Sequence, residues 1–203
     1  MIDHVAIAAA GLEAGAAVVA GELGLPLEAG GKHAAMGTHN RLLSLGPTEY
    51  LEVIAIDPAA PPPRRSRWFG LDAFDGPPRP VAWIISVQDM EAARALAPAG
   101  IGPALDLERG DLHWSLTVPE GGVGPFDGLF PALIRWHGPA HPAPRLTDRG
   151  ARLAALELHH PRAEALRAGL SGLVADPRVT VHPAERPAIR LTLRTPTGTI
   201  VLQ

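Results

Sequence analysis

The feature that most constrains the fold is a pattern of strands and helices that recurs along the chain. Leu12-Glu13-Ala14 lies in a predicted helix after a short apolar strand, and Met90-Glu91-Ala92 lies in the equivalent place 78 residues later. A third start of the same kind begins near Leu153. Repeats at a long period indicate one architecture built from similar units. We therefore predict two units paired in one curved sheet, with a third unit added.

Each unit is interpreted as a βαβββ module, because period-two alternation, helical apolar spacing and Gly or Pro stops follow one another in that order. The first module has strand 2–9, helix 12–23, a polar glycine-bearing stretch at 30–33, and strands 38–45 and 50–56. The second has strand 81–87, helix 89–96 and strands 104–108, 112–118 and 129–136. The third has strand 153–158, helix 162–170 and strands 178–183, 188–194 and 199–202.

The predicted fold class is α+β, with paired βαβββ modules in an open, curved mixed sheet and a third C-terminal βαβββ-like module. Residues 1–145 would form the main domain from modules 1–57 and 79–138, and residues 146–203 would pack the third module on the same unit. Residues 58–78 join the first two modules. Because four of the six residues 58–63 are proline, we expect an extended connector there.

Composition excludes several classes of function. The 203 residues carry 18 basic and 21 acidic side chains, a net charge of −3, without the clustered positive charge of a nucleic-acid-binding surface. The chain has no cysteine, so disulfides, thiolate nucleophiles and cysteine-based zinc sites are absent. No stretch reaches the roughly 18 apolar residues of a membrane span. We expect a cytoplasmic protein with neither nucleic acid nor membrane as partner.

Two charged or titratable side chains share strand faces with apolar residues. His4 alternates with Ile2 and Ala6, and Glu52 lies between Tyr50 and Ile54 on one strand face. Such a group must be hydrogen-bonded, paired or bound to a ligand, because an unpartnered buried charge is strongly destabilising. A lone histidine at such a position is explained equally well by a structural role, in which the partly buried imidazole has its hydrogen bonds satisfied. Glutamate inside an apolar strand favours a shared His4/Glu52 site.

A polar cluster surrounds the start of the strand 38–45. Its members are His33, Thr38, His39, Asn40 and Arg41. One interpretation is a polar turn in which Gly37 supplies backbone freedom. The other is a pocket wall, with His39 and Arg41 on one strand face and Thr38 and Asn40 on the other.

The second half contains tryptophans and one arginine in an otherwise apolar setting. Trp83, Trp114 and Trp136 are explained by core packing with their indole N–H groups satisfied, and Trp83 and Trp114 are also candidate substrate-binding residues. Arg135 lies on an apolar strand, where it would need an anionic partner such as Glu52 or a substrate carboxylate.

Together these residues resemble a known family. The segments that carry the resemblance are Asp3-His4-Val5, Gly30-Gly31-Lys32-His33, the run at 36–43 and Tyr50-Leu51-Glu52. They are similar to the glyoxalase-like domain of the vicinal oxygen chelate (VOC) superfamily, most specifically over residues 2–57 and more loosely through Trp136. The resemblance implies modules of the glyoxalase/bleomycin-resistance type around a small-molecule pocket.

The resemblance also implies a divalent metal, such as Zn, Ni, Mn or Fe, held by ligands from the first and last strand of each module. His4 and Glu52 match those positions in the first module. The second module departs from the pattern, since the counterpart of His4 is Ala82 and that of Glu52 lies near Pro131-Ala132. In the third module the residue at the position of His4 is Ala155, whose side chain cannot bind a metal either. A third ligand would have to come from elsewhere, with His39, His113 and His137 as candidates.

Three hypotheses of function follow. The first is a metal-dependent lyase, isomerase or dioxygenase acting on a small molecule with vicinal oxygens. The second is a metal-free protein that binds or sequesters a small ligand, and the third is a metal-independent acid–base enzyme in the same pocket. The candidate catalytic residues are His4, Glu52 and His39, and the candidate substrate-binding residues are His33, Thr38, Asn40, Arg41, Trp83, Trp114 and Arg135. An uncovered sheet edge in the third module predicts a homodimer.

Overall fold

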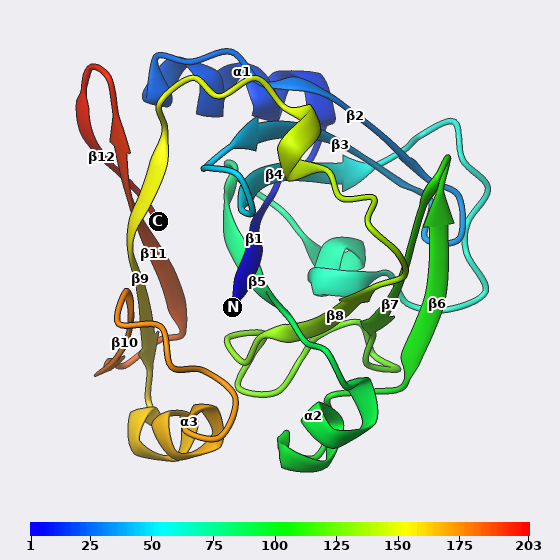
Figure 1. Cartoon of the computed structure of the whole chain (residues 1–203), viewed down its shortest axis with the longest axis vertical. Helices are drawn as coiled ribbons and strands as arrows, with labels where there is room; N and C mark the ends of the chain where they lie inside the picture. The colour runs from blue at the N-terminus through cyan, green and yellow to red at the C-terminus, as the bar shows by residue number, and fades with distance from the viewer.

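The computed structural model describes residues 1–203, and its strands form two sheets (Figure 1). The larger sheet contains β1 (Ile2–Ala8), β2 (Glu28–His33), β3 (Thr38–Ser44), β4 (Tyr50–Ile56), β5 (Arg79–Ser86), β6 (Ala104–Arg109), β7 (Leu112–Thr117) and β8 (Ala132–Trp136). The smaller sheet contains β9 (Arg152–His160), β10 (Val179–Pro183), β11 (Ala188–Thr195) and β12 (Gly198–Leu202). The helices are α1 (Leu12–Leu23), α2 (Met90–Leu96), α3 (Ala163–Leu170) and the short 3-10 helices η1 (Trp68–Ala73) and η2 (Ala143–Arg145).

The two predicted modules pair in the eight-stranded sheet, whose order is β2-β3-β4-β1-β5-β8-β7-β6. The modules meet where β1 and β5 run antiparallel. The pairs across this seam are Val5 with Trp83, His4 with Ile84, and Ala6 with Ala82. They are symmetric about Val5 and Trp83, which are 78 residues apart, so the predicted offset is confirmed and His4 corresponds to Ala82.

The same symmetry identifies the counterpart of Glu52. In the first module β1 runs parallel to β4 and Ala6 lies opposite Glu52. In the second module β5 runs parallel to β8 and Ile84, the counterpart of Ala6, lies opposite Ala132. Ala132 is therefore the residue that occupies the place of Glu52.

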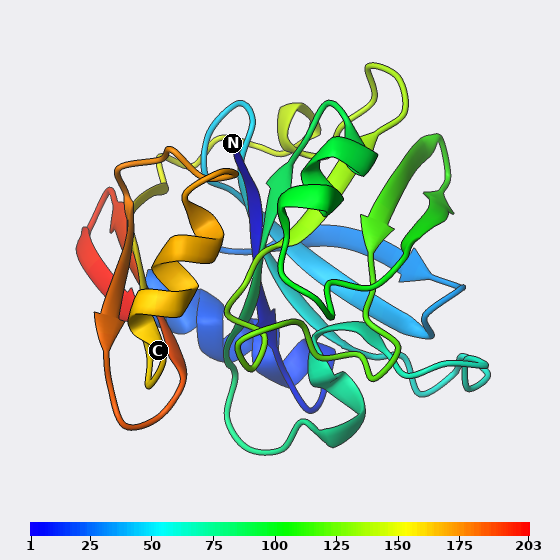
Figure 2. The same ribbon diagram turned by 90° about the horizontal axis from the view of Figure 1, so that it is seen from below.

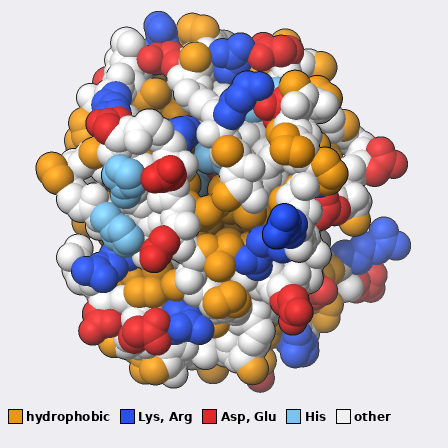
Figure 3. Space-filling view, turned by 90° about the vertical axis from the view of Figure 1, so that its right-hand side faces the viewer, with side chains coloured by type: hydrophobic (Ala, Val, Ile, Leu, Met, Phe, Trp, Pro, Cys, Tyr) orange, Lys and Arg blue, Asp and Glu red, His pale blue; other side chains and the backbone are white.

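The large sheet curls until its two outer strands, β2 and β6, come into contact. Figure 2 shows the β2–β3 and β6–β7 hairpins on the same side of the molecule, away from the small sheet. Gly31 on β2 packs directly against the side chain of Arg109 on β6. On the side where β6 lies, the surface is hollowed near its centre, and hydrophobic side chains there lie next to basic ones (Figure 3).

The third module has the predicted order of elements but pairs its strands differently. Its sheet order is β10-β9-β11-β12, and β9 runs parallel to β10 across α3. In the first module the first strand instead pairs with the last, β4. One face of this sheet packs against the outer face of β1 and β5, so Val5, Trp83, Leu156 and Leu191 belong to one buried core.

The proline-rich connector does more than link the modules. Its later part forms η1, which places Trp68 in the apolar cluster on the inner face of the large sheet. Arg65 fastens the connector to the second module by donating to the carbonyl oxygens of Val118 (2.9 Å) and Pro119 (3.2 Å). None of the helices in the structure has the length and apolar character needed to cross a membrane.

Candidate functional site

The candidate site is a small polar cavity of about 30 Å³ on the inner face of the large sheet. Strand alternation brings His4 of β1 and Glu52 of β4 to this face, as the sequence predicts. The other polar lining residues are His33, Asn40, Tyr50 and Arg109, and the aromatic walls are Trp68, Phe69, Trp114 and Trp136. The two predicted central residues therefore lie together in one cavity.

His4 is held between two carboxylates. Its Nδ1–H donates to Asp3 Oδ1 at 2.7 Å, and its Nε2 lies 3.7 Å from Glu52 Oε2. The register of β1 against β5 shifts between Ile2 and His4, a local bulge that re-aims side chains. The imidazole also stacks on the ring of Tyr50, with centroids 4.5 Å apart. These contacts fix the ring so that Nε2 faces the cavity.

Asp3 is almost completely buried and fully hydrogen-bonded. Its second oxygen accepts from Trp136 Nε1 (2.8 Å) and from His141 Nε2 (3.1 Å). Burial by itself would raise the pKa of the Asp3 carboxyl, but the hydrogen bonds from His141 and His4 hold that pKa well below its ordinary value. A buried carboxylate behind a histidine is the arrangement that orients and stabilises a proton-accepting imidazole.

Glu52 is positioned by an amide. Asn40 Nδ2 donates to Glu52 Oε1, and Asn40 Oδ1 accepts from the Gly31 backbone N–H at 2.7 Å. A Cβ atom at Gly30 would lie only 1.9 Å from Asn40 Oδ1, so a side chain at that position would displace the amide. Of the two glycines in the resemblance, Gly30 thus makes room for the amide that orients the carboxylate, and Gly31 holds that amide through its backbone N–H.

Arg109 reaches the site from the edge of the second module. Its Nη1 donates to His33 Nε2 (3.2 Å) and to Asn40 Oδ1 (3.3 Å), and it forms no ion pair with a carboxylate. Burial, followed by the charge of Arg109, lowers the pKa of His33 to about 3. The neutral His33 therefore accepts at Nε2 and donates from Nδ1 to Thr38 Oγ1 at 3.1 Å. The guanidinium keeps its positive charge free for an anionic ligand.

The side chains present do not make a full metal site. His4 and Glu52 are two donors, and Ala82 and Ala132 occupy the symmetry-related positions. No group of three or more His, Cys, Asp or Glu side chains in the chain is close enough to hold one ion. Catalytic metals usually have three protein ligands. The donor set therefore does not fit the metal centre that the resemblance implied.

The candidate third ligands lie outside the cavity. His39 is on the opposite face of β3 from Asn40, because successive side chains of a strand alternate, and its Nε2 is buried without a hydrogen-bond partner. His137 Nε2 contacts Ser115 Oγ at 2.8 Å, and His113 is exposed beside Glu108. We therefore leave all three histidines out of the proposed site, including His39, which the sequence suggested as catalytic.

Three of the predicted substrate-binding residues also lie elsewhere. Arg41 shares the outer face of β3 and pairs with Glu13 at 2.7 Å. Trp83 belongs to the core between the two sheets and donates to the Leu129 carbonyl oxygen at 2.8 Å. Arg135 is exposed on the outer face, because its neighbours Ile134 and Trp136 face the cavity, so it does not meet Glu52. His33, Asn40 and Trp114 do line the cavity, and Thr38 contacts His33.

Several residues of the site were not among those that the sequence suggested, including Arg109 and Trp68. Arg109 follows Leu105 and Leu107 at two-residue spacing, so it is a charged residue on an apolar strand face. That signal is the one that identified Glu52, but the predicted strand ended one residue too early. Trp68 lies in the connector, where no periodicity could indicate which face it covers.

Comparison with known proteins agrees with this architecture. A glyoxalase-like domain family matches residues 2–174, which extends the similarity into β9 and α3. No curated protein matches the chain. A solved structure described as a hypothetical protein from Staphylococcus aureus has the same fold, with a TM-score of 0.63 at 11% identity over 92% of this chain and 87% of that one. The chain therefore belongs to the glyoxalase-like domain family, in keeping with the VOC fold.

Proposed function

We propose that this protein is a glyoxalase-like enzyme that transfers a proton on a small, anionic, oxygen-rich substrate and needs no resident metal to do so. The observation that carries the proposal is the Asp3–His4–Glu52 chain, which ends beside the unpaired guanidinium of Arg109. A base, a second proton carrier and an anion-binding group thus surround one cavity.

His4 is the proposed base. Because its Nδ1–H donates to Asp3, the neutral imidazole presents the lone pair of Nε2 to the cavity. When Nε2 takes a proton from the substrate, the buried Asp3 carboxylate stabilises the resulting imidazolium. Glu52, held by Asn40 with its other oxygen 3.7 Å from Nε2, can receive that proton or return it to a different substrate atom.

Arg109 is the proposed substrate anchor. A guanidinium binds carboxylate or enolate oxygens through parallel N–H groups, and this one has no carboxylate of its own to neutralise. Neutral His33 adds no competing positive charge.

Hydrogen–deuterium exchange at carbon, followed by NMR in D₂O with pyruvate, glycolate and lactate, tests this function. After chelator treatment, the wild-type protein should catalyse exchange with at least one compound, at the C3 methyl group of pyruvate (α to its ketone) or at C2 of glycolate or lactate (α to the carboxylate). His4→Gln and Glu52→Gln should each slow it by about 10²–10⁴-fold. Arg109→Gln should mainly raise KM. Arg135→Gln, an exposed arginine on the outer face, is the matched control and should change nothing.

Measuring the metal content of the purified protein distinguishes the metal-independent proposal from the metal-dependent alternative. Near-stoichiometric metal in protein purified without chelator, lost in the His4→Ala/Glu52→Ala double variant together with turnover, would overturn the metal-independent proposal. Exchange that continues after chelation and is slowed in His4→Gln and in Glu52→Gln would support the metal-independent proposal.

A second candidate is a metal-free binding protein, favoured by the three tryptophans that wall the cavity. Saturable quenching of tryptophan fluorescence by one of these acids, without any isotope exchange, would select binding over catalysis.

The predicted homodimer is a separate proposal. β10 and β12 are open edges of the small sheet, and light scattering that gives the mass of a single chain would refute dimerisation.

A further inference from the structure

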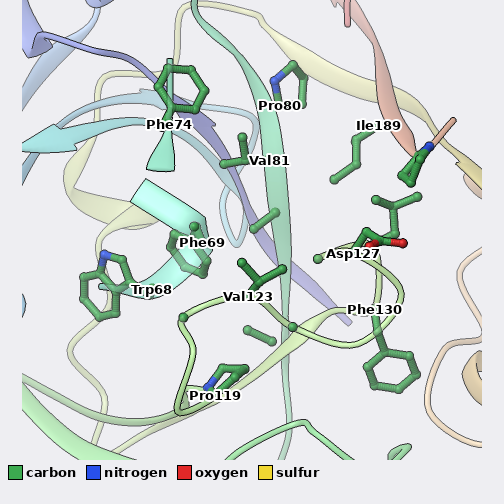
Figure 4. Close-up of a pocket in the computed structure, with 18 of the residues that line it drawn as sticks. Trp68, Phe69, Phe74, Pro80, Val81, Pro119, Val123, Asp127, Phe130 and Ile189 are labelled. Atoms are coloured by element: carbon green, nitrogen blue, oxygen red, sulfur yellow. The ribbon is translucent and has the colours of Figure 1, made fainter. Parts of the chain in front are cut away.

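A second and much larger cavity adjoins the candidate site. Its volume is about 310 Å³, and Trp68 and Phe69 line both cavities. Figure 4 shows these two rings on one side of the larger cavity, with Val123 and Ile189 among the residues around it. β11 of the third module therefore supplies part of the wall.

The larger cavity is apolar where the small one is polar. Ala82 and Ala132, the counterparts of His4 and Glu52, both line it. Its charged lining residues already have partners, since Arg79 stacks over Phe74 at 4.3 Å and Asp127 pairs with His160 at 2.9 Å. A cavity of about 150 Å³ can hold one benzene ring, so this one has room for a longer chain or a larger ring system.

The wall between the cavities is strained and incompletely hydrogen-bonded. Phe69 has φ +58°, a left-handed conformation that is unfavourable for a bulky residue, and Gly70 follows with φ +68°. Trp68 is only 3% exposed, yet its indole N–H has no hydrogen-bond partner. Both features cost stability, and a ligand that moved the two rings and supplied an oxygen would relieve them.

We propose that the 310 Å³ cavity binds the apolar tail of the substrate whose oxygenated head occupies the His4–Glu52 site. The substrate class is then a hydroxy or oxo acid with a medium-length alkyl or arylalkyl chain. Trp68 and Phe69 turn aside at Gly70 to join the cavities, and the freed Trp68 N–H donates to an oxygen of the head. The position of the head rests on the function proposed above, whereas the tail site rests on the cavity itself.

Calorimetric titration with a series of 2-hydroxy acids tests the tail site. From lactate through 2-hydroxybutyrate and 2-hydroxyhexanoate to 2-hydroxyoctanoate, affinity should rise about threefold to fourfold per methylene, because each CH₂ leaves water. Val123→Trp should fill the cavity from its loop and remove this dependence while lactate still binds. Val18→Trp is the matched control, since Val18 is similarly exposed (46% against 49%) but lies on α1.

Two outcomes overturn the tail site: equal affinity for lactate and 2-hydroxyoctanoate, or the same chain-length dependence in Val123→Trp as in the wild type. 1-Octanol, which has the chain without the acid, separates this failure from failure of the head site. Binding of 1-octanol that Val123→Trp abolishes and Arg109→Gln leaves unchanged supports the apolar cavity even if no acid binds, in which case only the proposed function fails.

Discussion

The two halves of the large sheet have the same fold but opposite inner surfaces. The first module presents His4 and Glu52, and the second presents Ala82 and Ala132 at the symmetry-related positions. The second module still contributes to the polar site, but through Arg109 at the far edge of the sheet. The comparison teaches that the fold conserves positions while the chemistry at each position is free to change.

The largest difference in stability between variants of the two halves should appear when a buried carboxylate of the first module is removed. Asp3→Ala leaves His4, Trp136 and His141 without their shared acceptor, and we expect the free energy of unfolding to fall by about 3–5 kcal/mol. Urea denaturation measures this loss. Asp111→Ala is the control, because Asp111 pairs with Arg145 in an exposed position and should matter little. Equal effects would contradict the central role of Asp3.

The next largest effect is a dependence of stability on pH. His33 has a pKa of about 3 in the folded chain and 6.5 ordinarily, so the unfolded chain binds the proton first as pH falls. Stability should therefore be complete above about pH 6.5 and decrease by about 1.4 kcal/mol per unit towards pH 3, or roughly 3 kcal/mol by pH 4.5.

Urea midpoints measured from pH 7 to pH 4.5 check this expectation. The His33→Gln variant should lose most of the slope. His113→Gln, an exposed histidine on the outer face of the second module, should keep it. A slope that is the same in both variants would show that His33 is not the group responsible.

Two glycine substitutions test the contact between the outer edges of the two halves. A Cβ atom at Gly31 would lie 2.6 Å from Arg109 Cδ, so Gly31→Ala should cost about 1–3 kcal/mol and weaken anion binding. Gly21→Ala in α1 meets nothing within 4 Å and should instead stabilise the protein by about 0.5–1 kcal/mol. Thermal unfolding of the two variants measures both signs. Stabilisation by Gly31→Ala would refute the close approach of the edges.

The smallest expected effect is that of Trp68, measured against Trp83. Trp68→Phe removes an indole N–H that has no partner, so we expect less than about 1 kcal/mol of destabilisation. Trp83→Phe, from the core between the sheets, also loses a hydrogen bond to Leu129 and should cost about 2–3 kcal/mol. Denaturant unfolding compares them. A larger loss at Trp68 would mean that its N–H is satisfied.

The sequence predicted the paired modules because their signals are local. Alternation along each strand placed His4 and Glu52 on the inner face, and the repeat gave the correct symmetry partner for His4. The features that the sequence did not predict depend on contacts between distant segments of the chain. The pairing of β9 with β10 and β11 depends on which strand lies beside which, and strand patterns alone do not specify partners.

The site was predictable to the same extent. The alternation of β3 separated Asn40 from His39, but only the structure showed that Asn40 faces the cavity. Arg135 lies on an apolar strand, which suggested a buried anionic partner, yet Arg135 itself is exposed on the outer face of β8. Alternation along β6 puts Arg109 on an apolar strand face, but Arg109 reaches the site only because β2 and β6 meet as the sheet closes, a long-range contact that no local pattern indicates.

The core shared by the two sheets has a consequence for unfolding. Trp83 of β5 and Leu191 of β11 are buried in the same cluster, so removing the small sheet would expose the apolar back of the large one. The two sheets should then open as one cooperative unit. Backbone amides at the centres of β5 and β11 should exchange their hydrogens at a common slow rate, set by global unfolding of the chain.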